Sequence, residues 1–343
     1  MLGEGRGGIE SAFAHYNDAL RAAGMEVTCL ITRDAKIGAS LAPDISVIEL
    51  KRYVQYDPRA WVQVVRLLRA QRPEVILTHG RRAQVIVACA QQFFGKVAPQ
   101  VVVLHRPRFK GLADADHVIA VSNALREAVI ATGVNAARVT HIPNFMTHVP
   151  NAPAPRAWQS PPVIGLLGRL VPEKGVDVFL GALAILRHQG VAVRARIGGS
   201  GPLAEELYAH AESLGVAGDI DWLGWVEDNA GFFASVDLFC LPSRRESFGL
   251  VMLEAFAQGK PVIATRTSGP CEVIADGKNG WLCDISAEAL ATTIRHAIEH
   301  PDEATAVARQ ARTDLAQYTV PAVAPRLAAC LTQVRSAHTY QSA

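Results

Sequence analysis

Short apolar runs alternate with amphipathic stretches along almost the whole chain, and this alternation restricts the fold more than any other feature of the sequence. Runs such as VTCLI have the length and composition of buried strands, and stretches such as SAFAHYNDALRAAG carry apolar residues at helical spacing. In the first half, the strand-like runs are 27–31, 75–78, 101–105 and 117–122, with helical patterns at 11–24 and 124–133. Such strand–helix alternation predicts a doubly wound parallel sheet.

A proline-rich break divides the chain into two similar halves. Residues 147–162, THVPNAPAPRAWQSPP, hold five prolines and show no apolar periodicity, which is typical of a linker. The second half repeats the alternation, with strand-like runs at 163–168, 193–199, 220–224, 238–243 and 261–265 and helical patterns at 175–189, 202–214 and 249–258. A chain of 343 residues also exceeds the usual size of one core.

We therefore expect an α/β protein of two doubly wound, Rossmann-like domains that face a cleft. The first is predicted to comprise residues 1–149, completed by a C-terminal helix at 325–343, and the second residues 150–324. In such sheets ligands bind at the carboxyl ends of the strands, so the cleft is the expected active site.

The first domain lacks an opening strand. A doubly wound domain begins with a buried strand, then a glycine-rich turn and a helix, but here the turn begins at Gly3. That strand is normally central, so its absence would leave backbone groups unpaired. We expect the natural protein to start upstream of Met1, with five to eight apolar residues that end in Met1-Leu2.

Composition excludes several classes of protein. Half of the residues are hydrophobic and 19% are charged, as in folded soluble proteins, and no apolar run is long enough to span a membrane. The start has no apolar signal region, and the six cysteines form no CxxC pair. We expect a cytoplasmic protein, free or bound at the inner face of the bacterial cytoplasmic membrane.

Charge is unevenly distributed along the chain. Residues 1–150 contain 18 Lys and Arg against 12 Asp and Glu, a net charge of +6, whereas the rest has a net charge of −4. The first half is therefore expected to meet an anionic or membrane-associated acceptor, and nucleic acid is not an expected partner. The basic stretch 59–70, RAWVQVVRLLRA, fits either a helix lying on anionic lipid or an ordinary core helix, and both interpretations stay open.

The glycine-rich start permits an alternative function. Gly3, Gly5 and Gly8 satisfy GxGxxG, and Asp34 follows the next strand, as in an NAD-dependent oxidoreductase. The strand that should precede this motif is absent. Gly7 and Gly8 also fit a turn whose amides face a phosphate or sugar, or a purely structural turn.

Two Asp-x-Asp pairs are candidate metal ligands. They are Asp114 with Asp116 and Asp219 with Asp221, and both stand where a strand begins, away from its carboxyl end. Aspartates that are exposed to solvent at the start of a strand explain both pairs better than a metal site does. We therefore predict no bound metal and no cofactor.

The most informative cluster lies within residues 165–284. Arg169 and Lys174 occupy one predicted strand-to-helix loop, and such cations bind phosphate. Glu246 follows a strand and Glu254 lies eight residues further, on the next predicted helix. The start of that helix offers the free amides of Phe248, Gly249 and Leu250 to a diphosphate.

Residues 163–284 resemble the nucleotide-sugar-binding domain of the retaining GT-B glycosyltransferases of family GT4. The matching segments are GRLVPEKG, GGSGP, ESFGLVMLEAFAQGKPVIAT and Gly280-Trp281-Leu282. Residues 1–149 resemble the acceptor-side half of these enzymes, though less distinctively. The matching segments are GGIE (7–10), THG (78–80), VVVLH (101–105), DHVIAVS (116–122) and IPNF (142–145).

The resemblance implies a role for each motif residue. Arg169 and Lys174 would bind the donor diphosphate, Glu254 the ribose and Glu246 the transferred sugar. The amides of Phe248, Gly249 and Leu250 would complete the phosphate site, and Gly7 and Gly8 would close on the donor from the other domain. His105 matches the histidine that approaches the transferred sugar, with His79 as a second candidate; a structural histidine is the other interpretation.

The sequence thus predicts a retaining, metal-independent hexosyltransferase that uses a nucleotide-diphosphate sugar, with a UDP-sugar preferred. The family's mechanism is front-face attack, in which the departing phosphate takes the acceptor's proton and no enzymic nucleophile is needed. Base selection near Gly224–Val226 is not readable from the sequence. The expected acceptor is an anionic glycan or glycolipid of bacterial lipopolysaccharide or surface-polysaccharide synthesis. A non-enzymatic binding module would leave the set of donor residues unexplained.

Overall fold

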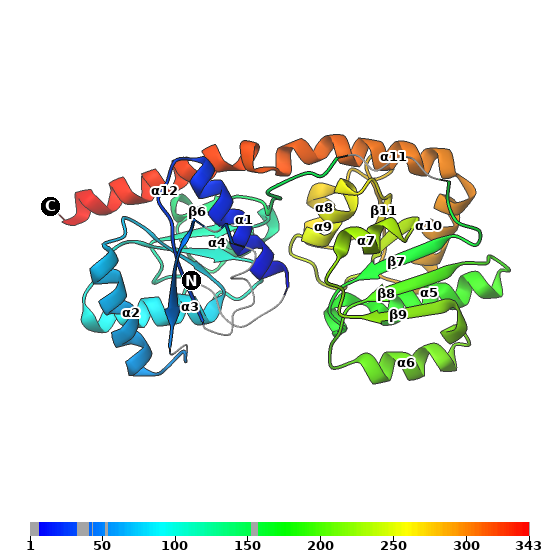
Figure 1. Cartoon of the computed structure of the whole chain (residues 1–343), viewed down its shortest axis with the longest axis horizontal. Helices are drawn as coiled ribbons and strands as arrows, with labels where there is room; N and C mark the ends of the chain where they lie inside the picture. Colours follow the sequence, from blue (N-terminus) through cyan, green and yellow to red (C-terminus); the bar gives the residue numbers. More distant parts are fainter. Residues whose placement is uncertain (1–6, 33–40, 43, 52–53, 152–156, 343) are drawn as a thin grey trace. The chain divides into compact units, whose positions relative to one another are not determined.

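The computed structural model describes residues 7–32, 41–42, 44–51, 54–151 and 157–342. The chain forms two compact units, each with its own parallel strands (Figure 1). Unit 1 comprises residues 1–148 and 318–343, and unit 2 comprises residues 149–317, so unit 2 ends before the predicted 324. The C-terminal helix also begins earlier than predicted, at Val320.

Unit 2 is a doubly wound sheet of six parallel strands in the order β12-β11-β10-β7-β8-β9. The strands are β7 (Val163–Leu167), β8 (Arg194–Gly198), β9 (Ile220–Gly224), β10 (Leu238–Leu241), β11 (Val262–Thr265) and β12 (Trp281–Cys283). The helices are α5 (Val176–His188), α6 (Ala204–Ser213), α7 (Asn229–Ala234), α8 (Leu250–Ala257), α9 (Ser268–Val273), α10 (Ala287–Glu299) and α11 (Pro301–Asp314). Short 3₁₀ helices lie at Pro172–Lys174, Ala217–Asp219 and Leu315–Tyr318.

The central strands of unit 2 are buried, because helices cover the sheet. β10 and β11 are buried along their whole length, as a parallel strand with helices on both faces must be. Phe179 and Leu183 of α5 pack with Ile294 of α10 in the same apolar cluster as Ile164 of β7. These packed layers confirm the predicted α/β fold.

Unit 1 contains two separate groups of parallel strands. β1 (Thr28–Thr32) pairs with β2 (Ser46–Leu50), and a second sheet has the order β3-β4-β5-β6. The members of the second sheet are β3 (Ile76–His79), β4 (Gln100–Leu104), β5 (His117–Ala120) and β6 (Val139–His141). Among the described residues no strand joins β1 to β3. The expected first strand, at and before Met1-Leu2, lies outside the described residues.

The helices of unit 1 are α1 (Gly8–Ala22), α2 (Pro58–Gln71), α3 (Arg81–Phe94), α4 (Asn123–Ala131) and α12 (Val320–Ser342), with a 3₁₀ turn at Ala136–Arg138. The C-terminal helix α12 packs against α1 and belongs to this unit (Figure 1). Its start is held by backbone hydrogen bonds between Met146 and both Tyr318 and Val320. Arg335 near its end pairs with Glu74 at 2.9 Å.

Helix α2 buries its apolar side. Val64, Val65 and Leu68 belong to a core cluster that includes Ile86 of α3, while Arg66 stays exposed. The apolar face of stretch 59–70 therefore packs in the core, as in the core-helix interpretation of this stretch. No helix in the described part of the chain combines the length and apolar character needed to cross a bilayer.

Candidate functional site

The candidate site of unit 2 lies where the winding of its sheet reverses. From β7 the chain winds outward through β8 to β9, and it returns to β10 on the other side of β7 before winding to β12. β7 and β10 are therefore neighbours, and the loops that follow them leave the carboxyl edge of the sheet in opposite directions. Such a reversal point is where ligands bind in doubly wound sheets.

Lys174 and Glu246 meet at this reversal point. Lys174 ends the loop after β7 and Glu246 lies in the loop after β10, and the lysine Nζ donates to Glu246 Oε2 at 2.5 Å. The side chains are 23% and 13% exposed, so the pair is shielded but still reachable from solvent. Arg169, five residues before Lys174 in the same loop, is exposed.

Two glycines allow these loops to approach so closely. Gly175 has a positive φ of 62°, and a Cβ there would overlap the carbonyl oxygen of Pro242. Gly199, with φ of 135°, lies equally close to the Gly168 carbonyl. The amide of Arg244 also donates to the Glu173 carbonyl at 2.8 Å. The glycines of the GRLVPEKG and GGSGP segments thus fix the loop positions and so the site.

Glu254 occupies a different environment in the same unit. It lies on α8 and accepts a hydrogen bond from Asn229 Nδ2, on the first residue of α7, at 2.7 Å. Burial is the main influence on this carboxyl group and raises its pKa to about 7, against a smaller opposing effect of the Asn229 hydrogen bond. Sequence reasoning missed Asn229, because no motif links it to Glu254 across 25 residues.

Helix α8 begins at Leu250, two residues after the predicted start near Phe248. Gly249 is its N-cap, with φ of 90° and no side-chain cap. The predicted amides of Phe248, Gly249 and Leu250 therefore lie at and just before the first turn, where helix amides lack intrahelical partners. Their loop is tied to α9, since the Gly269 amide and the Ser268 hydroxyl both donate to the Glu246 carbonyl.

In unit 1, His79 and His105 form a histidine pair. His79 ends β3 and His105 follows β4, so the parallel pairing of these strands brings the rings together. His79 Nδ1 lies 3.1 Å from His105 Nε2, and α1 presents Phe13 and Tyr16 edge-on to the His79 ring. Burial, followed by the neighbouring His105, holds the His79 pKa well below its ordinary value.

His105 is also uncharged at neutral pH. Burial lowers its pKa to about 4, with a smaller contribution from the charge of Arg106. Because both pKa values are lowered, the contact is one between two neutral rings, in which one ring nitrogen can donate its proton to the other. The structure brings together the two histidines that the sequence offered as separate candidates.

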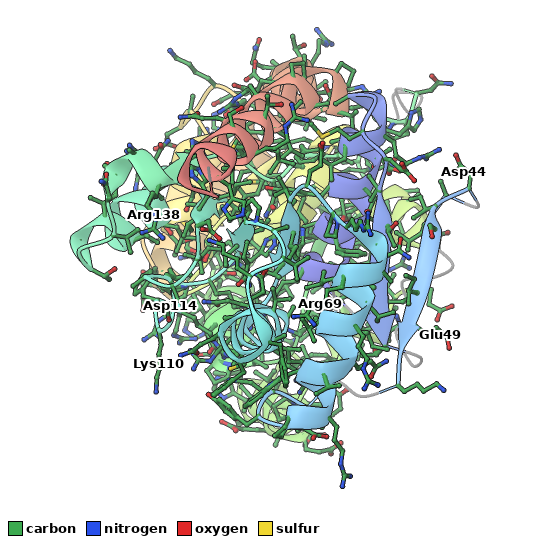
Figure 2. All side chains as sticks on the ribbon, turned by 90° about the vertical axis from the view of Figure 1, so that its left-hand side faces the viewer. Asp44, Glu49, Arg69, Lys110, Asp114 and Arg138 are labelled. Atoms are coloured by element: carbon green, nitrogen blue, oxygen red, sulfur yellow. The ribbon has the colours of Figure 1, made fainter. Side chains whose placement is uncertain are left out.

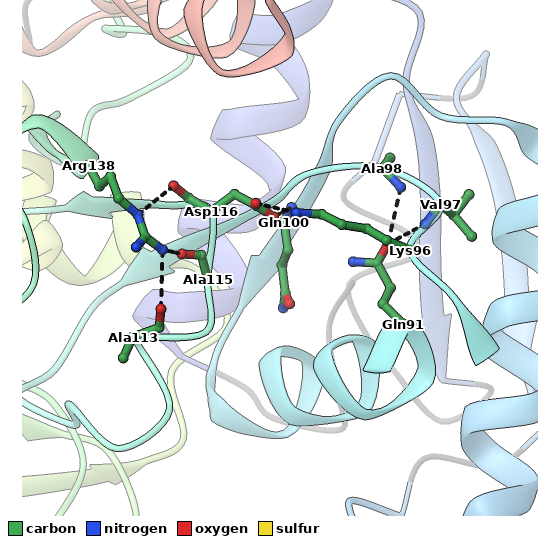
Figure 3. Close-up of polar contacts among 9 residues, drawn as sticks. All are labelled: Gln91, Lys96, Val97, Ala98, Gln100, Ala113, Ala115, Asp116 and Arg138. Atoms are coloured by element: carbon green, nitrogen blue, oxygen red, sulfur yellow. Dashed lines mark hydrogen bonds and ion pairs between the residues drawn. The ribbon is translucent and has the colours of Figure 1, made fainter. Parts of the chain in front are cut away.

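Three of the four aspartates of the Asp-x-Asp pairs have protein partners. The Asp116 carboxylate accepts hydrogen bonds from the backbone amide of Gln100 at 2.8 Å and from Lys96 Nζ at 2.5 Å (Figure 3). Arg138 closes the same segment by donating to the Ala113, Ala115 and Asp116 carbonyls (Figure 3). Asp114 lies at the surface (Figure 2).

The second pair is engaged in the same way. Asp219 pairs with Arg187 at 2.7 Å, and Asp221 pairs with Arg194 and Arg196. These ion pairs agree with the interpretation favoured by the sequence, in which the aspartates are surface residues at the start of a strand.

Some predicted site residues cannot be compared. Gly3, Gly5 and Asp34, which carry the oxidoreductase alternative, lie outside the described residues. Gly7 is the N-cap of α1 and Gly8 its first residue, so the predicted glycine turn does open a helix.

Family profiles cover nearly the whole chain. Residues 151–314 match the glycosyl transferases group 1, and residues 6–149 match glycosyltransferase family 4. The chain belongs to the GT4-type glycosyltransferases, a family of retaining enzymes with the GT-B fold, and the oxidoreductase interpretation does not hold.

Individual relatives agree with this assignment. The lipopolysaccharide core biosynthesis glycosyltransferase LpsE of Rhizobium meliloti is 29% identical over 85% of this chain and 86% of its own length. A GDP-mannose-dependent phosphatidylinositol monomannoside mannosyltransferase of Mycolicibacterium smegmatis is 32% identical over 57% of this chain and 56% of its own. Among solved structures, Anabaena HepE in complex with UDP-glucose matches with a TM-score of 0.82 at 24% identity, covering 96% of this chain and 97% of that one.

Proposed function

We propose that this glycosyltransferase transfers a hexose from a UDP-sugar, with retention and without a metal ion in the transfer reaction, to a glycan or glycolipid acceptor of bacterial lipopolysaccharide or surface-polysaccharide synthesis. The observation that carries the donor assignment is the Lys174–Glu246 pair at the reversal point of the unit 2 sheet. The similarity to LpsE supports the acceptor class, and the UDP-glucose bound to HepE supports the donor base.

The charges of this site suit the departure of a diphosphate. As the glycosidic bond breaks, negative charge develops on the leaving phosphate oxygens. Lys174 and the exposed Arg169 supply positive charge from one loop, and the first amides of α8 add hydrogen-bond donors. Because these groups can carry the leaving charge together, the proposed transfer needs no divalent metal.

Glu246 has a positioning role in this proposal. Its carboxylate is held by Lys174 and accepts hydrogen bonds, so it can bind hydroxyl groups of the transferred sugar. The departing phosphate takes the proton of the acceptor hydroxyl, and no enzymic nucleophile is required. Glu254, on α8, is assigned to the ribose hydroxyls.

The His79–His105 pair suits an uncharged role beside the sugar. A neutral His105 can donate or accept one hydrogen bond without adding charge to the oxocarbenium-like state. A protonated ring would oppose the positive charge that develops on the sugar. The low pKa of His105 therefore favours its assignment as a hydrogen-bonding group.

A donor screen tests the proposal. Release of free nucleotide from UDP-, GDP- and ADP-sugars would be measured with and without EDTA, and UDP release that persists in EDTA is expected. Lys174→Ala and Arg169→Ala should each lower turnover by about 10²–10³, as expected when a group that stabilises the transition-state charge is lost. Lys278→Ala, which removes an exposed lysine of the same unit, is the matched control.

Three results would contradict the proposal. Full activity in both variants would remove Lys174 and Arg169 from the donor site. Preference for a GDP-sugar, as the mycobacterial relatives' names state for those enzymes, would replace the UDP assignment. Loss of activity in EDTA that Mg²⁺ restores would overturn metal independence.

A further inference from the structure

A cluster of metal-ligating side chains lies at the junction of α10 and α11. His296 is on the last turn of α10, His300 is the residue between the helices, and Glu303 is in the first turn of α11. One potential ligand atom from each lies within 4.8 Å of the other two. None of the three belongs to the donor site described above.

We propose that His296, His300 and Glu303 bind one zinc-like divalent transition-metal ion that links α10 to α11. Imidazole nitrogen and carboxylate oxygen are the ligands that Zn²⁺ takes in proteins, at about 2.0–2.2 Å. Two ligands of a tetrahedral zinc are therefore roughly 3.4 Å apart. His296 Nε2 and Glu303 Oε2, at 3.1 Å, are already close to this spacing.

Existing contacts hold both imidazoles in place. His300 Nδ1 lies 2.8 Å from the His296 carbonyl oxygen, which places a proton on Nδ1 and leaves the Nε2 lone pair for a metal. A backbone carbonyl bound to the second ring nitrogen is the usual support of a metal-binding histidine. The buried Trp281 packs edge-on to the His296 ring, and the two histidine rings stack with centroids 4.4 Å apart.

Local charge and exposure also favour a cation. Segment 296–303, HAIEHPDE, contains three carboxylates and two histidines and no lysine or arginine. The side chains of His296 and Glu303 are each 42% exposed, so an ion can reach them and water can complete its coordination. Three protein ligands and an open position are compatible with zinc.

The position of the site gives it a structural effect. His300 separates two helices of 13 and 14 residues, and the only covalent link between them is this residue. An ion bound to the last turn of one helix and the first turn of the next would fix their angle. Because an ion that binds only the folded state stabilises it, the melting temperature should rise with metal concentration.

Zinc binding to the full chain without an affinity tag tests the proposal. At pH 7.5 we expect one saturable Zn²⁺ equivalent in titration calorimetry, a higher melting temperature, and Co²⁺ absorption bands of a four- or five-coordinate ion. His300→Ala should weaken binding at least tenfold and abolish the thermal shift. His210→Ala removes an exposed histidine of α6 and is the matched control.

The assay does not depend on transfer activity, so it can fail or succeed independently of the proposed function. Glu303→Gln, which keeps the side-chain shape, should also weaken binding, and it serves if His300→Ala does not fold. No saturable Zn²⁺ binding, or equal affinity in the parent and both variants, would overturn the site.

Discussion

At the scale of single residues, Glu254 is the group of the proposed donor site whose charge depends most on its surroundings. Its pKa is raised to about 7 mainly by burial, against an ordinary value of 4.5. The folded protein therefore keeps a proton that the unfolded chain releases between these two pH values. The stability that this proton binding contributes is fully present below pH 4.5 and is lost as pH rises through 7.

Glu254→Gln should reveal this dependence. Glutamine can still accept the Asn229 hydrogen bond but carries no charge, so the variant should gain melting temperature relative to the parent as pH rises from 5 to 8. Calorimetric melting across this range is the measurement. Glu205→Gln, on an exposed position of α6, is the matched control, and a parent–variant difference that stays constant with pH contradicts the raised pKa.

The sequence predicted candidate donor-site residues from their motifs and spacing. Lys174 and Glu246 were predicted together because each follows a strand, and parallel strands bring such loops to one edge, where the two side chains do meet. Asn229 was not predicted, because its contact with Glu254 depends on how α7 packs beside α8. The His79–His105 contact was not predicted either, because it depends on the register in which β3 pairs with β4.

At the scale of elements, the space between β1 and β3 is the main departure from a continuous sheet. A cavity of about 530 Å³ is lined by Cys29 of β1, Leu77 of β3, Tyr16 of α1 and Leu331 of α12. The Tyr16 hydroxyl is buried and has no hydrogen-bond partner among the described residues. A buried unsatisfied polar group costs about 1–3 kcal/mol, so this hydroxyl is expected to lower the stability of unit 1.

Removing the Tyr16 hydroxyl should therefore stabilise unit 1. We predict that Tyr16→Phe raises the melting temperature by a few degrees, because the variant no longer buries a hydroxyl group without a hydrogen-bond partner. Tyr208→Phe, at a half-buried position of α6, is the control. A Tyr16→Phe variant that melts at or below the temperature of the parent would contradict the cost assigned to this hydroxyl.

The remaining elements show what periodicity can and cannot predict. Long buried strands and helices with clear apolar faces, such as β4 and α5, were predicted from their patterns. β2 was missed because its side chains are mostly exposed, and β6 and β12 because three residues are too short for a pattern. Such strands are defined by pairing with a neighbour and carry little signal of their own.

At the scale of the whole molecule, charge separates the two halves of the sequence. The half up to residue 150 has a net charge of +6 and the remainder −4. Helix α2 presents arginines to solvent, with Arg69 visible in Figure 2, and the neighbouring Tyr56 and Phe93 are 65% and 62% exposed. Phe93 stacks on Trp61 of α2 with ring centroids 5.2 Å apart. The exposed Tyr56 and Phe93, beside arginines, suit the headgroup region of an anionic bilayer.

We therefore predict salt-dependent binding to anionic lipid through the arginine face of α2. Each basic residue near such a surface contributes about 1 kcal/mol, and salt screens this attraction. In sedimentation with vesicles containing phosphatidylglycerol, the bound fraction should fall several-fold between low and physiological salt. Arg66→Glu should lower it further, whereas Arg309→Glu makes the same charge change in unit 2 and should not. Equal binding to uncharged vesicles, or no binding at low salt, would contradict this prediction. A soluble anionic acceptor would then be the remaining explanation for the positive charge of the first half.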